Sequence, residues 1–405
     1  MGSSFLGAGP ATHATFAPAA FGMSHRLNLF RKISAHTVFF PAAALYAVIV
    51  LPLSILTMLG LAPAPQALAG GFGHAHEMLF GYGLAVVAGF LLGALSISRI
   101  FTLVALWAGA RISFLLAPRD FLPFALNIAF AAVITAQIAP KYMRAAKKWR
   151  NKAFVPVLVG IAIALIAQEF ARYSGNGEAQ HLEYLETVLL FALLMLFMGG
   201  RIIAPAAAGQ FYRQKQFLEP RVQPKLEATL IGTMGVAIVL VPFPVGRIPA
   251  AMAVAAAGII AMLRLLRWRL WLARDRPDLW CLGAGYCWIS VGLLLTAYAS
   301  FTDDGLTVAL HALTVGALGT LTLNVMARIA TMRAKRDPAH GWAPITGTLL
   351  ISLATFARLG AGFAAKSGDL LLLFSAGCWS AAFITLLGLF IRLRHQVAVT
   401  RGNTE

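Results

Sequence analysis

The chain has 405 residues, of which 59% are hydrophobic and only 12% are charged, and its mean hydropathy is +0.77. Soluble globular proteins carry about 25% charged residues, so this chain has too little charge to cover a surface that faces water; disordered, coiled-coil and disulfide-stapled classes are excluded for the same reason. The net charge of +18 favours cationic loops on the cytoplasmic side of a membrane over a nucleic-acid partner.

Twelve runs of the sequence are long and apolar enough to be membrane-spanning helices, which need about 20 mostly apolar residues. They lie near 36–60, 76–97, 100–117, 121–140, 153–172, 184–204, 226–243, 248–270, 279–301, 306–330, 343–365 and 369–391. The alternation of a β-barrel is absent. We therefore expect an all-α, polytopic membrane bundle of about twelve helices over residues 36–393, with a cytoplasmic arm at 1–35 and a cytoplasmic tail at 394–405.

The basic residues predict the orientation of this bundle. Of the 33 Lys and Arg residues, four fall in outside loops (Arg119, Arg172, Arg247 and Lys366) and two fall within spans (Arg111 and Arg358), if both termini lie inside. The other 27 then lie on the cytoplasmic side, which is the distribution expected of short cytoplasmic loops. We expect a multi-pass protein of the inner cell membrane, with both termini in the cytoplasm and the lipid bilayer as its partner.

Histidines open two of the spans that run from outside to inside. The second span begins with residues 74–82, which read HAHEMLFGY, and the tenth contains residues 311–316, which read HALTVG. His76 and His311 are each followed five residues later by a glycine, Gly81 and Gly316. Because glycine lacks a Cβ, another group can approach the backbone closely at these positions.

Two arginines, Arg111 and Arg358, fall in the same outer third of the membrane. A single ionisable group there can reach the interface by extending its side chain, but histidines on two helices together indicate function. Imidazole pairs from facing helices suit haem iron, so we expect His76 and His311 to bind a haem b. No CxxCH motif is present, so the haem would be non-covalent, with Arg111 and Arg358 pairing with its propionates.

The remaining polar residues of the second span have less defined roles. Two residues apart on a helix point about 200° apart, so His74 and His76 cannot both face one metal. We expect His74 just before the first turn, where it is free to bind a second metal or a water on the propionate side of the haem. Glu77 would pair with an arginine or carry protons, and no residue is assigned as catalytic.

These motifs resemble those of the NnrS family. Residues 74–82, followed by Gly89-Phe90-Leu91-Leu92, are similar to one family signature, and residues 311–320 (HALTVGALGT) are similar to a second. The resemblance covers nearly the whole chain. It implies a bacterial inner-membrane protein with twelve spans that contains haem and copper and takes part in denitrification and in protection against nitric oxide.

The sequence departs from the family pattern on the cytoplasmic side. Gly283 stands where a histidine is expected before Gly285-Tyr286, residues 332–336 (MRAKR, with Arg333) replace a Gly-His-Thr-Gly-Arg segment, and residues 96–98 (SIS) replace Asn-Trp-Thr. These departures count against an inner metal site and leave the outer histidines intact. Histidines on the second and tenth of twelve spans also resemble the topology of haem–copper oxidases and nitric oxide reductases, which is a likeness of topology and not of chemistry.

Three functions remain open from the sequence. The first is a haem protein that binds or detoxifies nitric oxide, or another small diatomic ligand, or protects metal centres from it; if catalytic, it would be an oxidoreductase, and no residue pattern identifies its electron donor. The second is a transporter or handler of copper or haem. The third is a redox-inert assembly or signalling partner whose histidines only maintain structure.

Overall fold

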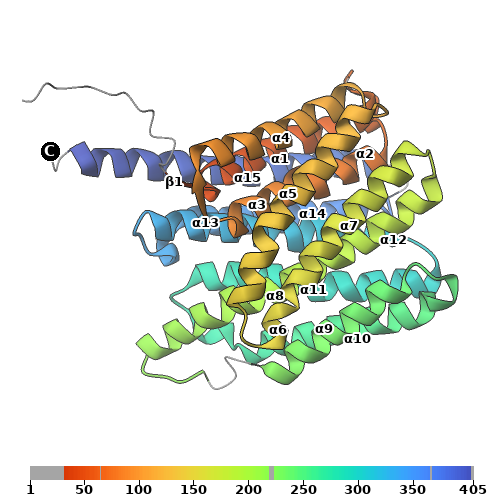
Figure 1. Cartoon of the computed structure of the whole chain (residues 1–405). Helices are drawn as coiled ribbons and strands as arrows, with labels where there is room; N and C mark the ends of the chain where they lie inside the picture. The colour runs from red at the N-terminus through yellow and green to blue at the C-terminus, as the bar shows by residue number, and fades with distance from the viewer. Residues whose placement is uncertain (1–31, 64, 219–222, 365–366, 403–405) are drawn as a thin grey trace, which may run out of the picture.

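The computed structural model describes residues 32–63, 65–218, 223–364 and 367–402, and these parts form a bundle of long helical rods (Figure 1). In chain order the rods are α1 (His36–Met58), α2–η2–α3 (Gly71–His76, Glu77–Gly83 and Leu84–Leu91), α4 (Ile97–Leu116), α5 (Phe121–Ala145), α6 and α7 (Trp149–Lys152 and Phe154–Tyr173), α8 (Gly177–Arg213), α9 (Pro224–Leu240), α10 (Arg247–Arg267), α11 (Pro277–Thr302), α12–η6–α13 (Leu306–His311, Ala312–Gly319 and Thr320–Arg333), α14 (Trp342–Ala361) and α15 (Gly368–Gly402). The predicted all-α bundle is confirmed.

Ten helices of the described chain are long and apolar enough to cross a membrane, so this is a multi-pass membrane protein. Two rods fall outside that set. The rod over residues 71–91 carries the polar side chains of His74, His76 and Glu77, and α9 has only 17 residues.

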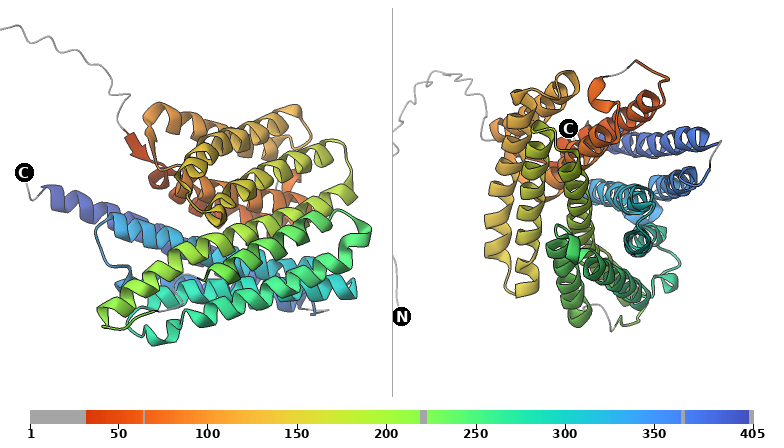
Figure 2. Two further views of the ribbon diagram at one scale, coloured as in Figure 1. Left: turned by 60° about the horizontal axis from the view of Figure 1, so that its bottom comes forward. Right: turned by 90° about the vertical axis from the view of Figure 1, so that its right-hand side faces the viewer.

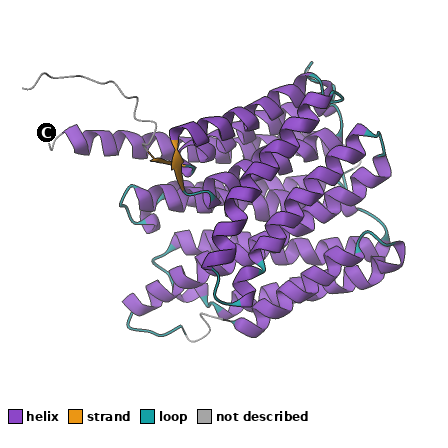
Figure 3. Cartoon of the chain, in the orientation of Figure 1, coloured by secondary structure: helices purple, strands orange, loops and turns teal. Residues whose placement is uncertain are grey.

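Some element boundaries differ from those expected. The second rod begins at Gly71 and not at 76, and α15 continues past 393 to Gly402. Within the expected N-terminal arm, β1 (Lys32–Ser34) pairs antiparallel with β2 (Ala94–Ser96), as the orange segment of Figure 3 shows. Residues 1–31 of that arm lie outside the described residues.

The helices place both histidine segments at one end of the bundle. In Figure 1, α2 and α12 lie at the end opposite to β1 and the C-terminal part of α15. α1 packs against α15 and α3, whereas α4, α5 and α7 pack in succession on the other side. The two views of Figure 2 show the rods arranged around α8, the most buried of the candidate spans, with 78% of its most apolar window inside the bundle.

Glycines bring some of these helices into close contact. A Cβ on Gly89 of α3 would lie 2.6 Å from the Phe40 ring of α1, and a Cβ on Gly319 would lie 2.6 Å from the Trp379 ring of α15. Small residues at such crossings are the usual means by which membrane helices gain dispersion contacts, since lipid provides little hydrophobic driving force between them.

Both histidine-bearing rods contain a π-helical segment directly after the histidine. η2 follows His76 and η6 follows His311. π-helical turns are rare and often occur at functional sites. The region around η2 and η6 is therefore the best candidate for a functional site.

Candidate functional site

A cavity of about 410 Å³ lies beside the first turns of α2 and α12. Its volume is in the range of small-molecule and cofactor sites, about 300–1,000 Å³. Most of its lining is apolar, and the polar side chains that face it are His74, His181, His311, Arg358, Tyr82, Tyr184, Thr307 and Thr314. Residues from α1, α2, η2, α8, α12, η6, α14 and α15 contribute to the wall. We call it the histidine cavity.

His74 reaches the histidine cavity with one ring nitrogen already bonded. Its Nδ1 lies 2.7 Å from the hydroxyl oxygen of Ser54 on α1, and that hydroxyl donates its hydrogen to the Leu51 carbonyl at 2.7 Å. With the Ser54 hydrogen on the Leu51 carbonyl, Nδ1 of His74 is the donor in their contact. The Nε2 atom of His74 is then left with its lone pair.

His311 has the same tautomer for a simpler reason. Its Nδ1 lies 2.6 Å from the Thr307 carbonyl oxygen, which can only accept. Within the described parts of the chain, the Nε2 atoms of His74 and His311 have no hydrogen-bond partner. The guanidinium nitrogens of Arg358 have none there either. Hydrogen bonds from Nδ1 of this kind are the usual outer support of a histidine that binds metal through Nε2.

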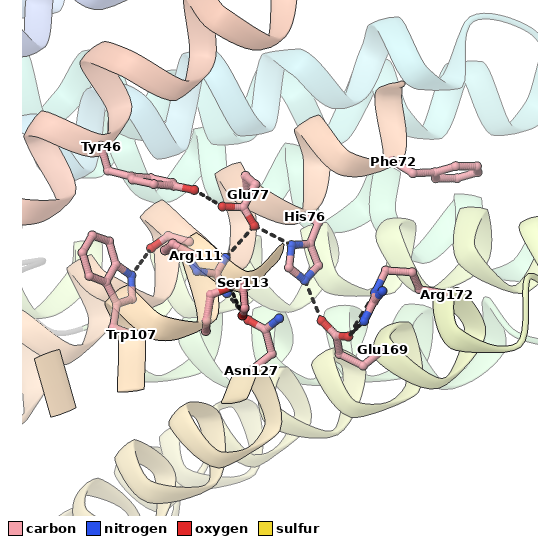
Figure 4. Close-up of polar contacts among 12 residues, drawn as sticks. Tyr46, Phe72, His76, Glu77, Trp107, Arg111, Ser113, Asn127, Glu169 and Arg172 are labelled. Carbon is pink, nitrogen blue, oxygen red and sulfur yellow. Dashed lines mark hydrogen bonds and ion pairs between the residues drawn. The ribbon is translucent and has the colours of Figure 1, made fainter. Parts of the chain in front are cut away.

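His76 lies on the other side of the same turn and takes part in a buried polar cluster (Figure 4). Its Nδ1 is 2.8 Å from Glu77 Oε1 and its Nε2 is 2.7 Å from Glu169 Oε1 on α7. The imidazole stacks on the Phe114 ring of α4, with ring centroids 4.1 Å apart. His76, Glu77 and Glu169 are fully buried, so this set of contacts is closed to solvent.

Two arginines pair with the two carboxyl groups of the cluster. Arg111 on α4 donates to Glu77 Oε1 at 2.7 Å and also to Asn127 on α5, while Tyr46 on α1 donates to the other Glu77 oxygen. Arg172 donates through Nε to Glu169 Oε2 at 3.1 Å. A buried carboxylate without such partners would be unstable, because burial removes its hydration.

The proton count at His76 decides what this imidazole can do. Each of its two contacts with a carboxyl oxygen requires one proton between the two atoms. If both glutamates are ionised, His76 is an imidazolium; if one is protonated, that carboxyl donates to the ring nitrogen. In both cases no lone pair of His76 is free, so it would have to lose a partner before it could bind a metal.

Gly81 and Gly316, the glycines of the two motifs, leave space that other side chains of this protein fill. A Cβ on Gly81 would lie 2.8 Å from the Tyr46 ring and 3.0 Å from Arg111, and the Gly81 carbonyl accepts from Trp107 at 2.8 Å. A Cβ on Gly316 would lie 2.8 Å from the Trp288 ring. The close approach expected at both glycines is present, and protein groups make it.

The structure brings together a different set of residues from the one expected. It places His74 beside His311 and Arg358 in the histidine cavity, and it places His76 with Glu77 and Arg111 in the polar cluster. His74 does not precede the first turn, because the helix begins at Gly71. Glu77 pairs with an arginine, as expected.

Several residues of the site had no role assigned from the sequence. Ser54, the Thr307 carbonyl, Asn127 and Tyr46 carry no local pattern that marks them. Glu169 belongs to the polar cluster, and His181 lines the histidine cavity.

No group of three or more His, Cys, Asp or Glu side chains is arranged to hold a metal ion in the described residues. The three cysteines are free. Where the sequence departs from the family pattern, Gly283 is packed by the Leu270 side chain, and Arg333 lines a separate cavity with His36 and Arg394.

Comparison with known proteins gives one family. The sequence model of the NnrS protein family matches residues 33–394. A search of curated proteins finds no match.

Proposed function

The chain belongs to the NnrS family, and we propose that it holds one haem b between His74 and His311 and serves the cellular response to nitric oxide. In this proposal the protein binds or detoxifies nitric oxide, or protects other metal centres from it. Bound haem supplies a redox-active iron with affinity for small diatomic ligands.

The observation that carries the proposal is the pair of imidazoles with free Nε2 atoms. Both Nδ1 atoms are donors to oxygen, at 2.7 Å to Ser54 and 2.6 Å to Thr307. Two nitrogen ligands are too few for a protein site that holds zinc, which takes three or four protein ligands. Two imidazoles would hold a porphyrin-bound iron, and one of them would have to leave before nitric oxide could bind there.

Other groups of the histidine cavity also fit a haem. Arg358 has a guanidinium without a partner in the described chain and is suited to a propionate. The apolar lining from α1, α8, η6 and α15 would exclude water from the macrocycle. Arg111, the other propionate partner expected from the sequence, is already engaged by Glu77 and Asn127.

The test is an absorption spectrum of the purified protein, oxidised and dithionite-reduced, with metal analysis of the same sample. We expect b-type bands at about one haem per chain, which His74→Ala and His311→Ala each abolish or convert to a five-coordinate spectrum. His76→Gln is the control on the same turn, because its amide keeps a hydrogen-bonding group between the two buried glutamates, and we expect its bands to be retained. Loss of the bands in His76→Gln alone would overturn the assignment of His74, and a featureless spectrum after expression with ample haem would overturn the haem itself.

Transport or handling of copper or haem is the second candidate. One observation favours it: interruptions of α-helical geometry, η2 and η6, occur in two spans at the same end of the bundle, and transporters often bind substrate at irregular helices. Uptake of copper or haem into vesicles that contain the purified protein would support this function, and its absence alongside b-type bands would exclude it.

A further inference from the structure

A second, smaller cavity of about 80 Å³ lies among α3, α8, α11 and α13. Its wall consists of Gly83, Val86, Val87, Phe90, Leu91, Phe191, Leu194, Met195, Met198, Gly199, Ile202, Ile203, Leu282, Leu318, Leu321, Thr322 and Val325. We call it the apolar cavity. None of these residues belongs to the polar cluster, and of them only Leu318 also lines the histidine cavity.

The apolar cavity offers nothing to a polar occupant. The only hydroxyl in its wall belongs to Thr322, and this group donates to the Leu318 carbonyl and also pairs with the Tyr82 hydroxyl. A buried water needs two to four polar partners, and cavities that lack them stay dry. A charged or hydrogen-bonding ligand would lose its hydration without compensation. The occupant that fits is small, uncharged and apolar.

One layer of side chains separates the apolar cavity from the histidine cavity. Leu318 lines both cavities, and Tyr82 of the histidine cavity is hydrogen-bonded to Thr322 of the apolar cavity. The two π segments meet this wall, since η2 ends at Gly83 and η6 includes Leu318. A rotamer change of Leu318 alone would alter the barrier between the two spaces.

We propose that the apolar cavity binds a small diatomic gas molecule and delivers it to the histidine cavity past Leu318. An engineered apolar cavity of about 150 Å³ binds xenon, so a space of about 80 Å³ suits a molecule of two atoms. Apolar solutes leave water for such surroundings without any specific contact. The delivery step rests on the function proposed above, whereas the binding step does not depend on haem.

Xenon is the probe for the binding step, measured by ¹²⁹Xe NMR on the protein in lipid nanodiscs. We expect the wild type to bind one xenon atom at this position. Two variants that fill the cavity from different helices, Val87→Phe and Val325→Phe, should lower xenon affinity at least tenfold. Val239→Phe on the outer face of α9, where the residue is 65% exposed, is the matched control and should bind like the wild type. Equal xenon binding in all four proteins, or no binding in the wild type because lipid chains fill the space, would overturn the proposal.

The delivery step is measured on haem-loaded protein as the rate of nitric oxide association after flash photolysis. We expect Val87→Phe and Val325→Phe to slow association several-fold with an unchanged Soret band, and Val239→Phe to leave the rate unchanged. Unchanged rates in the filled variants would overturn delivery. Failure to load haem would count against the proposed function only, because the xenon measurement still decides whether the apolar cavity binds gas.

Discussion

Removal of the Arg111 guanidinium tests whether charge compensation holds the buried polar cluster together. Arg111 is 3% exposed, and it donates to Glu77 Oε1 at 2.7 Å and to Asn127. In Arg111→Met the Glu77 carboxyl stays buried at 0% exposure and loses its guanidinium partner. Breaking a buried ion pair from one side costs about 3–5 kcal/mol, and Glu77 then keeps only its contacts with His76 and Tyr46. We expect a loss of that size in the free energy of unfolding.

Two further variants separate this effect from ordinary side-chain loss. In the double variant Arg111→Met/Glu77→Gln both charges are gone, and replacement of a whole buried pair is often nearly neutral, so much of the lost stability should return. Arg247→Met is the matched control, because Arg247 pairs with Asp303 at 2.8 Å while the two side chains are 45% and 76% exposed. Exposed pairs are worth about 0–1 kcal/mol.

The free energies of unfolding can be compared by SDS titration in mixed micelles, followed by far-ultraviolet circular dichroism. The reasoning is refuted if Arg111→Met loses no more stability than Arg247→Met. It is also refuted if the double variant is less stable than Arg111→Met, since the cost would then come from lost packing.

Two other predictions concern single atoms of the site. Ser54→Ala removes the acceptor of the His74 Nδ1 hydrogen, and loss of such outer support typically weakens metal binding about 10–100-fold; a titration of apo-protein with haem checks this, and unchanged affinity would contradict it. Gly81→Ala places a Cβ 2.8 Å from the Tyr46 ring, and overpacking of this kind costs about 1–3 kcal/mol. Gly377→Ala on the exposed side of α15 has nothing within 4 Å of its Cβ and should gain up to about 1 kcal/mol from helix propensity; equal stability of the two variants in the SDS titration would speak against the packing argument.

The bundle could be predicted from the sequence because hydropathy is a local property of each run. The start of the second rod could not. Residues 70–73 read GGFG, which is typical of a loop, yet the helix begins at Gly71. A local contact explains one of these glycines: a Cβ on Gly73 would lie 1.6 Å from the Ala67 carbonyl oxygen, so this turn packs against the preceding segment only with glycine there.

The site was only partly predictable for a related reason. The spacing of His74 and His76 correctly places the two imidazoles on different faces. Which of them faces the cavity depends on partners supplied by other spans, namely Ser54 on α1 and Glu169 on α7. A ring nitrogen of His76 that is hydrogen-bonded to a carboxyl group has no free lone pair for a metal. The residue pattern of the second rod does not indicate that this carboxyl group is present. The π-helical geometry of η2 and η6 likewise has no marker in the residues themselves.

Two histidines on one helical turn therefore have different hydrogen-bond partners and different roles. His76 has both nitrogens bonded to carboxyl groups, which suits it to hold α2 against α4 and α7 and leaves it nothing to offer a metal. His74 has one nitrogen bonded to a hydroxyl, which fixes its tautomer and leaves the other nitrogen free. Because no side chain belongs to both environments, Arg111→Met should change the free energy of unfolding and leave the haem spectrum intact, and Ser54→Ala should do the reverse. A variant that changes both properties would show that the turn itself couples the cluster to the cavity.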